Sequence, residues 1–195
     1  MHAVIVPIVR TNDAVGAALV EAAVGRVEAE ARDLGVRIRV DRREGIRPGE
    51  KFAHWELRGV PLRIVAGAKD LAEGVLTVVR RVDGDERRIA VEGLARELPT
   101  LLDEAQAAIH GRAHALLAER SREVSTLDEL RGAFEVEPVF ANAPFCNSAD
   151  CEDRVKAAVH GISVRNLRAD RRAEGAPCLV CGTPADHVAL IAKAY

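Results

Sequence analysis

Aromatic residues are scarce in this sequence: they make up 3% of its 195 residues, with one tryptophan, one tyrosine and four phenylalanines. No apolar run approaches the roughly 20 residues that a membrane-spanning helix needs. The first ten residues, MHAVIVPIVR, lack the basic start and the small-residue cleavage site of a secretory signal. We therefore expect a soluble, cytoplasmic protein without a membrane partner.

Excess charge of one sign is also missing. The formal net charge is −2 at pH 7, so the composition gives no global signal for nucleic-acid binding and none for DNA. One segment differs, because six basic residues stand against three acidic ones between positions 37 and 51. Such a segment suits a partner touched in one place, but on this feature alone a solvated loop with paired charges is the favoured reading. The basic residues are Arg37, Arg39, Arg42, Arg43, Arg47 and Lys51.

The first two thirds of the chain alternate between strand-like and helix-like patterns. Helical spacing after Thr11, Asn12 and Asp13 predicts a helix that Gly35 ends. Asp83-Gly84 predicts a hairpin turn between two of the strands. Strand–helix–strand order predicts an α/β domain, with a mixed five-stranded sheet flanked by helices. The predicted strands are 3–9, 36–41, 60–67, 75–81 and 87–93, and the further helices are 51–58 and roughly 94–123.

Pro99 lies within the longest predicted helix, where we expect it to be tolerated only near the first turn. After residue 125 the character changes, and Ser125 or Thr126 is a candidate cap of another helix. We therefore predict two domains, 1–124 and 125–195, of which the second is a small α+β domain.

All four cysteines of the chain lie in its last fifty residues. Cys146 and Cys151 have four residues between them, Cys178 and Cys181 have two, and 26 residues separate the pairs. Two close thiol pairs of this kind predict a structural, tetrahedral Zn²⁺ site without an open position for chemistry. A thioredoxin-type redox pair at 178–181 and a set of inert buried thiols are the alternatives, and neither explains why the cysteines occur in pairs.

The histidines offer weaker metal-binding patterns. His110 and His114 are four residues apart on the long predicted helix, a spacing that brings two side chains to one face. With no third ligand nearby, we expect them to face solvent.

The segment GEKFAHWELRGVPLRI, residues 49–64, gathers two of the few aromatic residues among charges. Phe52 and Glu56 are four residues apart, so on a helix they share a face. Trp55 is one residue off that line, and we expect it to be part of the core. Glu56 is a candidate for recognition, or else for a simple ion pair with Lys51 or Arg63.

The run DRREGIRPGEKFAHWELRGVPLRIVAGAKDL closely resembles the anticodon-binding domain of class II prolyl-tRNA synthetases. The cysteine region is similar to the zinc-binding C-terminal domain of the archaeal and eukaryotic type, in which C-x₄-C and C-x₂-C-G thiols hold zinc and the chain ends in tyrosine. Together these features cover essentially the whole chain. The resemblance implies the class II anticodon-binding fold, tRNA(Pro) as partner and structural Zn²⁺ as cofactor.

In relatives, the positions that match Phe52, Glu56, Arg63 and Lys69 face the anticodon. The resemblance therefore implies that an anticodon base stacks on Phe52, that Glu56 accepts from the N–H groups of guanine, and that Arg63 donates to guanine acceptors. Lys69 and Arg43 would hold phosphates, which set affinity and its salt dependence. Arg43 could equally belong to an ion pair with Asp41 or Glu44.

Such synthetases also have a catalytic domain that binds ATP and proline, and the resemblance does not extend to that domain. The chain lacks the FRxE string of the ATP site, so we expect no catalytic residues and no ligase activity from this chain alone. A catalytic domain or chain is then a further possible partner, toward which the terminal carboxylate of Tyr195 would reach. The alternative is a free-standing protein-interaction or regulatory module derived from a synthetase.

Overall fold

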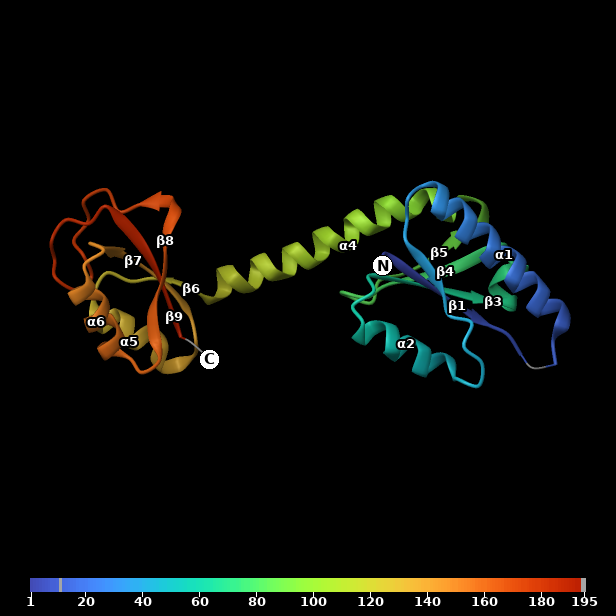
Figure 1. Ribbon diagram of the computed structural model, residues 1–195, viewed down its shortest axis with the longest axis horizontal. Helices are drawn as coiled ribbons and strands as arrows, with labels where there is room; N and C mark the ends of the chain where they lie inside the picture. The colour runs from blue at the N-terminus through green and yellow to red at the C-terminus, as the bar shows by residue number, and fades with distance from the viewer. Residues whose placement is uncertain (11, 194–195) are drawn as a thin grey trace. The chain divides into compact units, whose positions relative to one another are not determined.

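The computed structural model describes residues 1–10 and 12–193, and these form two compact units, Met1–Arg112 and the part of the chain from Ala113 onward (Figure 1). The division falls within the long helix α4 (Val91–Arg120). The boundary expected at residue 125 therefore remains a prediction. The prediction for Tyr195 lies outside the described residues.

The first unit is built on a five-stranded sheet in the order β2-β1-β3-β4-β5. The first three of these are parallel and the last two are antiparallel, so the predicted mixed α/β sheet is confirmed. Gly84, with a φ of +74°, lies in the turn between β4 and β5, as Asp-Gly predicted. The strands are β1 (Ala3–Ile8), β2 (Ile38–Val40), β3 (Leu62–Gly67), β4 (Val75–Arg80) and β5 (Glu86–Ala90).

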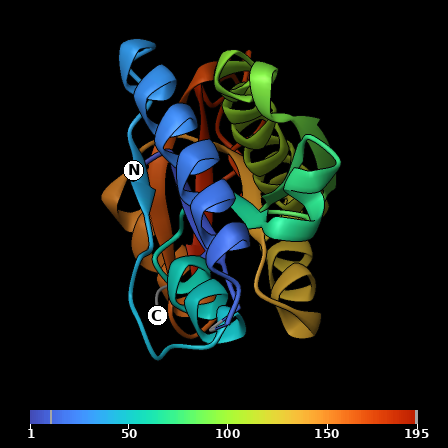
Figure 2. The ribbon, with the colours of Figure 1, turned by 90° about the vertical axis from the view of Figure 1, so that its right-hand side faces the viewer.

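The two faces of this sheet carry different helices. The larger core lies on the face covered by α1 (Ala14–Asp33), the long blue helix of Figures 1 and 2, and by the first half of α4. Ile5, Ile64 and Leu76 are fully buried there. The opposite face carries the short helix α2 (Pro48–Leu57), whose Trp55 packs on Val4 of β1. The indole is 4% exposed, so its predicted place in the core is confirmed.

Local signals explain the ends of these helices. The Asp13 side chain caps α1 by accepting from the amide of Gly16 at 2.7 Å, and Gly35 follows the helix with a φ of +70°. Helix α2 begins at Pro48, three residues before the predicted start. Proline fits the first helical position because its missing N–H would have no partner there. The short helix α3 (Ala68–Ala72), which directly follows β3, was not predicted.

Pro99 lies in the interior of α4, so the expectation of a first-turn position was wrong. The helix begins at Val91, whose amide donates to the carbonyl of Gly74 at 3.0 Å. Leu94, Leu98 and Leu101 then bury one face of the helix and hold it in place despite the hydrogen bond that Pro99 cannot make.

The second unit has a four-stranded sheet in the order β6-β7-β9-β8. Its helix α5 begins after Thr126, whose hydroxyl accepts from the amide of Glu129 at 3.1 Å, while the Glu129 carboxylate accepts from the amide of Ser125. Phe145, Leu130 and Ile191 lie in its core. The elements are β6 (Ser121–Glu123), α5 (Leu127–Val136), β7 (Phe140–Phe145), α6 (Ala149–Ala158), β8 (Ile162–Arg172) and β9 (His187–Lys193).

Within the described parts of the chain, no helix has the length and apolar character needed to cross a bilayer.

Pro99 generates the first prediction. Because its side chain is exposed and its missing amide costs a helical hydrogen bond, Pro99→Ala should raise the free energy of unfolding of the first unit by about 1–3 kcal/mol. Denaturant unfolding followed by Trp55 fluorescence measures this, because the only tryptophan lies in that unit. Exposed Arg96→Ala in the same helix is the control, and an unchanged or lower midpoint for Pro99→Ala would contradict the prediction.

Candidate nucleic-acid interface and metal centre

The structure brings together three of the five residues singled out for recognition. Helix α2 presents Phe52 and Glu56, and the adjacent strand β3 presents Arg63. Nη1 of Arg63 donates to Oε1 of Glu56 at 2.6 Å, and the guanidinium carbon lies 4.2 Å from the centre of the Phe52 ring. The guanidinium therefore stacks on the ring while it holds the carboxylate.

Glu56 is the accessible member of this trio. Its side chain is 56% exposed, whereas that of Arg63 is 18% exposed. A carboxylate has about four acceptor positions, and the bond from Arg63 occupies one of them. Glu56 thus forms the ion pair with Arg63 that was one of the two alternatives for it, and its other acceptor positions remain available to a ligand. The Nε atom of Arg63 is buried without a hydrogen-bond partner among the described residues.

A pocket of about 260 Å³ lies beside the trio. Its lining also includes Arg81, Gly84 and Glu86, which belong to the hairpin of β4 and β5. Sequence reasoning missed these three residues, because only the antiparallel pairing of β3 with β4 brings the hairpin next to α2.

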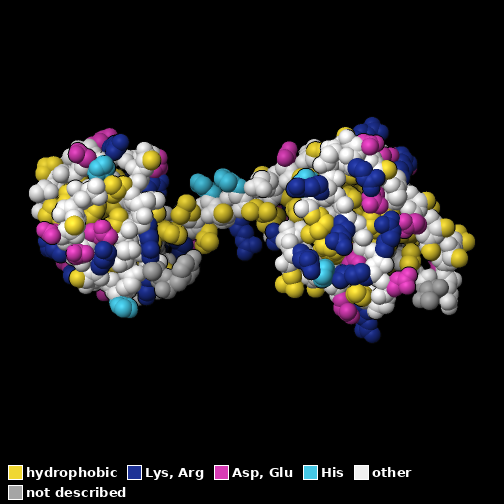
Figure 3. Space-filling view, in the orientation of Figure 1, with side chains coloured by type: hydrophobic (Ala, Val, Ile, Leu, Met, Phe, Trp, Pro, Cys, Tyr) yellow, Lys and Arg dark blue, Asp and Glu magenta, His cyan; other side chains and the backbone are white. Residues whose placement is uncertain are grey.

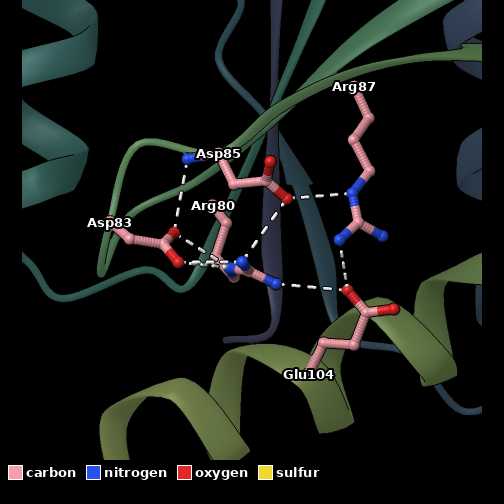
Figure 4. A network of polar contacts seen from close by, with 5 residues as sticks. All are labelled: Arg80, Asp83, Asp85, Arg87 and Glu104. Atoms are coloured by element: carbon pink, nitrogen blue, oxygen red, sulfur yellow. Dashed lines mark hydrogen bonds and ion pairs between the residues drawn. The ribbon is translucent and has the colours of Figure 1, made fainter. Parts of the chain in front are cut away.

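A network of ion pairs ties this hairpin to helix α4 (Figure 4). Arg80 donates to Asp83 at 2.8 Å and to Glu104 of α4 at 3.1 Å, and Arg87 lies 2.7 Å from the same Glu104 oxygen. The hydrogen bonds from Arg80 lower the pKa of the Asp83 carboxyl group. Because the network crosses from the hairpin to α4, it stabilises the position of one wall of the pocket.

Asp41 is the polar centre beneath helix α2. It is 2% exposed, and its carboxylate accepts from Nε of Arg43 at 2.8 Å, from Nη2 of Arg43 at 2.6 Å and from the indole N–H of Trp55 at 2.8 Å. Its backbone carbonyl accepts from Nζ of the buried Lys51 at 3.0 Å. The bonds from Arg43 and then from Trp55 hold the pKa of Asp41 well below its usual range.

Arg43 and Lys69 lie away from the trio. Arg43 pairs with Asp41, as the structural alternative foresaw, and its side chain remains 38% exposed. Lys69 is exposed on α3, just past the end of β3, whereas Arg63 is the second residue of that strand. Both cations follow the carboxyl ends of parallel strands, so they belong to the same edge of the sheet. Figure 3 shows basic side chains, with acidic ones among them, on the visible face of the first unit.

The second unit gathers all four cysteines. Cys146 follows β7, Cys151 lies in the first turn of α6, and Cys178 and Cys181 lie between β8 and β9. Their four sulfur atoms lie within 4.8 Å of one another, with 3.5 Å between Cys146 and Cys151 and 3.8 Å between Cys146 and Cys181. Ligands at about 2.3 Å around tetrahedral Zn²⁺ are about 3.8 Å apart, so the donor set is compatible with structural zinc. All four thiols are free.

Two similar turns build this cluster. The residue after Cys146 is Asn147, with a φ of +62°, and the residue after Cys181 is Gly182, with a φ of +73°. In each turn the next backbone amide, that of Ser148 or Thr183, donates to the preceding cysteine sulfur. Both turns therefore point a backbone amide at a cysteine sulfur. The Cys178–Cys181 segment is a turn between strands and opens no helix, unlike a thioredoxin-type motif.

The thiols differ in their surroundings. Hydrogen bonds from the hydroxyl and amide of Thr183 lower the pKa of Cys181 to about 6. Burial, followed by the bond with Cys146, raises the pKa of Cys151 to about 12. The described residues contain no other group of three or more potential metal ligands, and His110 and His114 are exposed on α4 as expected.

Residues 2–101 match the family model of the anticodon binding domain, and residues 127–195 match the model described as prolyl-tRNA synthetase, C-terminal. This chain belongs to the anticodon-binding domain family. The five-stranded unit is thus an anticodon-binding domain, and the unit with the cysteines matches a C-terminal domain of prolyl-tRNA synthetases. The family and the fold that the sequence suggested are both confirmed.

Curated relatives with matching sequence are proline–tRNA ligases. That of Cenarchaeum symbiosum (strain A) is 35% identical over 195 residues, which is all of this chain and 40% of the relative. That of Roseiflexus castenholzii (strain DSM 13941 / HLO8) is also 35% identical, over 98% of this chain and 39% of the relative. That of Thermococcus kodakarensis (strain ATCC BAA-918 / JCM 12380 / KOD1) is 35% identical over 87% of this chain. The chain spans about 40% of the length of the first of these relatives.

Asp41 of the anticodon-binding domain generates the second prediction. Asp41→Asn should lower the free energy of unfolding at pH 7 by about 1–3 kcal/mol, because it removes the charge that Arg43 and Trp55 stabilise. The pKa of Asp41 is lower in the folded chain than in the unfolded chain, where it is near 4, so the ionised carboxylate stabilises the fold above about pH 4. This contribution is lost as the pH falls from that value toward the pKa of the folded chain. The difference between wild type and variant should therefore shrink below about pH 4.

Unfolding curves at several pH values, followed by Trp55 fluorescence, measure this difference. Glu44→Gln is the control, because Glu44 is an exposed carboxylate in the same segment and its loss should change stability by no more than about 0.5 kcal/mol. A difference between wild type and Asp41→Asn that stays constant from pH 7 to pH 3 would contradict the assignment.

Proposed function

We propose that this chain binds tRNA(Pro) through its anticodon, as the C-terminal part of a proline–tRNA ligase, and that Zn²⁺ held by its four cysteines stabilises the second unit. The observation that carries the proposal is the cluster of Phe52, Glu56 and Arg63 on an anticodon-binding fold. The names of the relatives support proline as the amino acid. The charging reaction belongs to the catalytic domain or chain with which this part would act.

Each member of the trio has a physical role in this proposal. The Arg63–Phe52 stack provides a flat platform, on which an unstacked base gains about 1–3 kcal/mol. Glu56 keeps acceptors for the two N–H donors on the Watson–Crick edge of guanine, and the anticodon of tRNA(Pro) carries two guanines. Arg63 fixes the orientation of this carboxylate and has further N–H donors for guanine O6 or N7.

The more distant cations complete the proposed surface. Lys69 is exposed beyond the end of β3, and Arg43 has an exposed portion although Asp41 holds it. Contacts from such groups to phosphates strengthen binding without reading the sequence, and each contact increases its salt dependence. The bond to Asp41 holds the guanidinium of Arg43 in one orientation, which reduces the entropy lost when it contacts a phosphate.

Glu56 gives the decisive test of recognition. Glu56→Ala should reduce the preference for tRNA(Pro) over a variant tRNA without the anticodon guanines by about 5- to 150-fold, because the acceptor for the guanine N–H groups is lost. Filter binding at fixed salt gives the ratio of the two dissociation constants. Glu50→Ala, an exposed residue of the same helix, is the control. If Glu56→Ala keeps the wild-type ratio, Glu56 does not read guanine.

Removal of the metal tests the second part of the proposal. Purified protein should contain one zinc per chain, and a strong chelator or Cys151→Ser should unfold the second unit while Trp55 still reports a folded first unit. Zinc analysis and circular dichroism before and after chelation measure the two effects. Half-buried Ser163 of β8 lies outside the cluster, so Ser163→Ala serves as the control. A metal-free protein with undiminished secondary structure would contradict a structural role for zinc.

A further inference from the structure

A buried lysine of α2 has no role in the proposed anticodon surface. Lys51 is 7% exposed, and Nζ donates to the backbone carbonyl of Asp41. Within the described residues no carboxylate forms an ion pair with this ammonium group, because the Asp41 carboxylate is engaged by Arg43 and Trp55. Burial of an ammonium group without a counter-charge is costly, so this position favours an anion from outside the chain.

Lys51 lines a pocket of about 600 Å³, a volume typical of small-molecule sites. The pocket lies at the carboxyl ends of β1 and β2. From β1 the chain enters α1 on one face of the sheet, and from β2 it enters α2 on the other face. A crevice at such a divergence between neighbouring parallel strands is where open α/β sheets bind ligands.

Two arginines of the same pocket retain hydrogen-bonding capacity. Arg43 uses Nε and Nη2 for Asp41, and Arg42 uses the same two atoms for Glu21. Within the described residues, Nη1 of each guanidinium forms no hydrogen bond, and Lys51 has two further donors. Three cationic groups that line one pocket therefore have donors to spare for the oxygens of a phosphate group.

The remainder of the lining limits the kind of ligand. Its apolar wall, which includes Ile8, Val20 and Ile46, and its volume leave room for a flat organic group beside a phosphate. Three carboxylates also line the pocket: those of Glu21 and Asp41 are paired with Arg42 and Arg43, and the exposed one of Glu44 adds negative charge that disfavours more than one phosphate. These features together fit a nucleoside monophosphate better than a bare anion or a triphosphate.

We propose that this pocket binds a nucleotide unit through its phosphate group, with Lys51 as the central contact. The nucleotide has two possible sources, a residue of the bound tRNA or a free nucleoside monophosphate. The first source rests on the proposed function, whereas the pocket itself rests on its own geometry.

Titration of the full chain with adenosine monophosphate tests the pocket. Trp55 is the only tryptophan and is bonded to Asp41, so its fluorescence reports the site, and calorimetry measures the affinity independently. We expect saturable binding of the monophosphate, weak binding of inorganic phosphate and none of adenosine. Lys51→Met should weaken binding about tenfold or more, whereas Lys156→Met, at an exposed lysine of the second unit, should leave it unchanged.

The proposal would be overturned by two results together. The wild type would show no saturable binding of adenosine monophosphate, and Lys51→Met would bind tRNA with the same salt dependence as the wild type. A folded Lys51→Met that keeps wild-type affinity for adenosine monophosphate would also overturn it. If that variant does not fold, Arg42→Gln takes its place, because Arg42 is exposed and its loss should also weaken binding.

Binding of tRNA separates the two sources. If the pocket holds a tRNA residue, adenosine monophosphate should compete with tRNA, and Lys51→Met should reduce the salt slope of tRNA binding by about 1. If the ligand is a free nucleotide, tRNA affinity should stay unchanged in both experiments. A chain that binds the monophosphate but no tRNA supports the pocket and contradicts the proposed function.

Discussion

The buried carboxylate of Asp41 is the interaction on which the recognition side of the anticodon-binding domain depends. It accepts from the indole of Trp55 and so fixes helix α2 on the sheet, and it accepts from Arg43 and so orders the segment after β2. Its carbonyl holds Lys51 as well. Because Phe52 and Glu56 lie on the same short helix, their position relative to Arg63 of β3 follows from this one buried group.

The two units rely on different sources of stability. The first buries a continuous apolar core between its sheet, α1 and α4, and adds the ion-pair network of Arg80, Arg87 and Glu104 at its surface. The second is smaller, and its cysteine cluster connects β7, α6 and the segment before β9 at one point. Under the proposed zinc binding, a metal would join segments that are distant in sequence, which short domains with small cores need.

Sequence reasoning predicted the parts that have local or strongly patterned signals. The five strands, the turn at Asp83-Gly84 and the two close cysteine pairs all depend on residues close together in the chain, and Asp13, which caps the first helix, was one of three candidate residues before it. The role of Asp41 and the burial of Lys51 depend on contacts between β2, α2 and β1, which no local pattern contains. The one available signal was the tryptophan itself, since a buried indole N–H needs an acceptor. Pro99 in mid-helix was missed because tertiary packing there overrides local preference.

The length of strand β3 sets the spacing of the residues along it. Arg63 near its start and Gly67 at its end are four residues apart, which is about 13 Å at roughly 3.3 Å per residue, and Lys69 lies just beyond. Under the proposed role, an RNA that contacts Arg63 and Lys69 with both side chains extended away from the sheet covers about this length, or about four nucleotides stacked at roughly 3.4 Å each. A three-base anticodon is shorter than that, so the backbone flanking it would have to reach the far cation, and loop length would enter recognition alongside base identity.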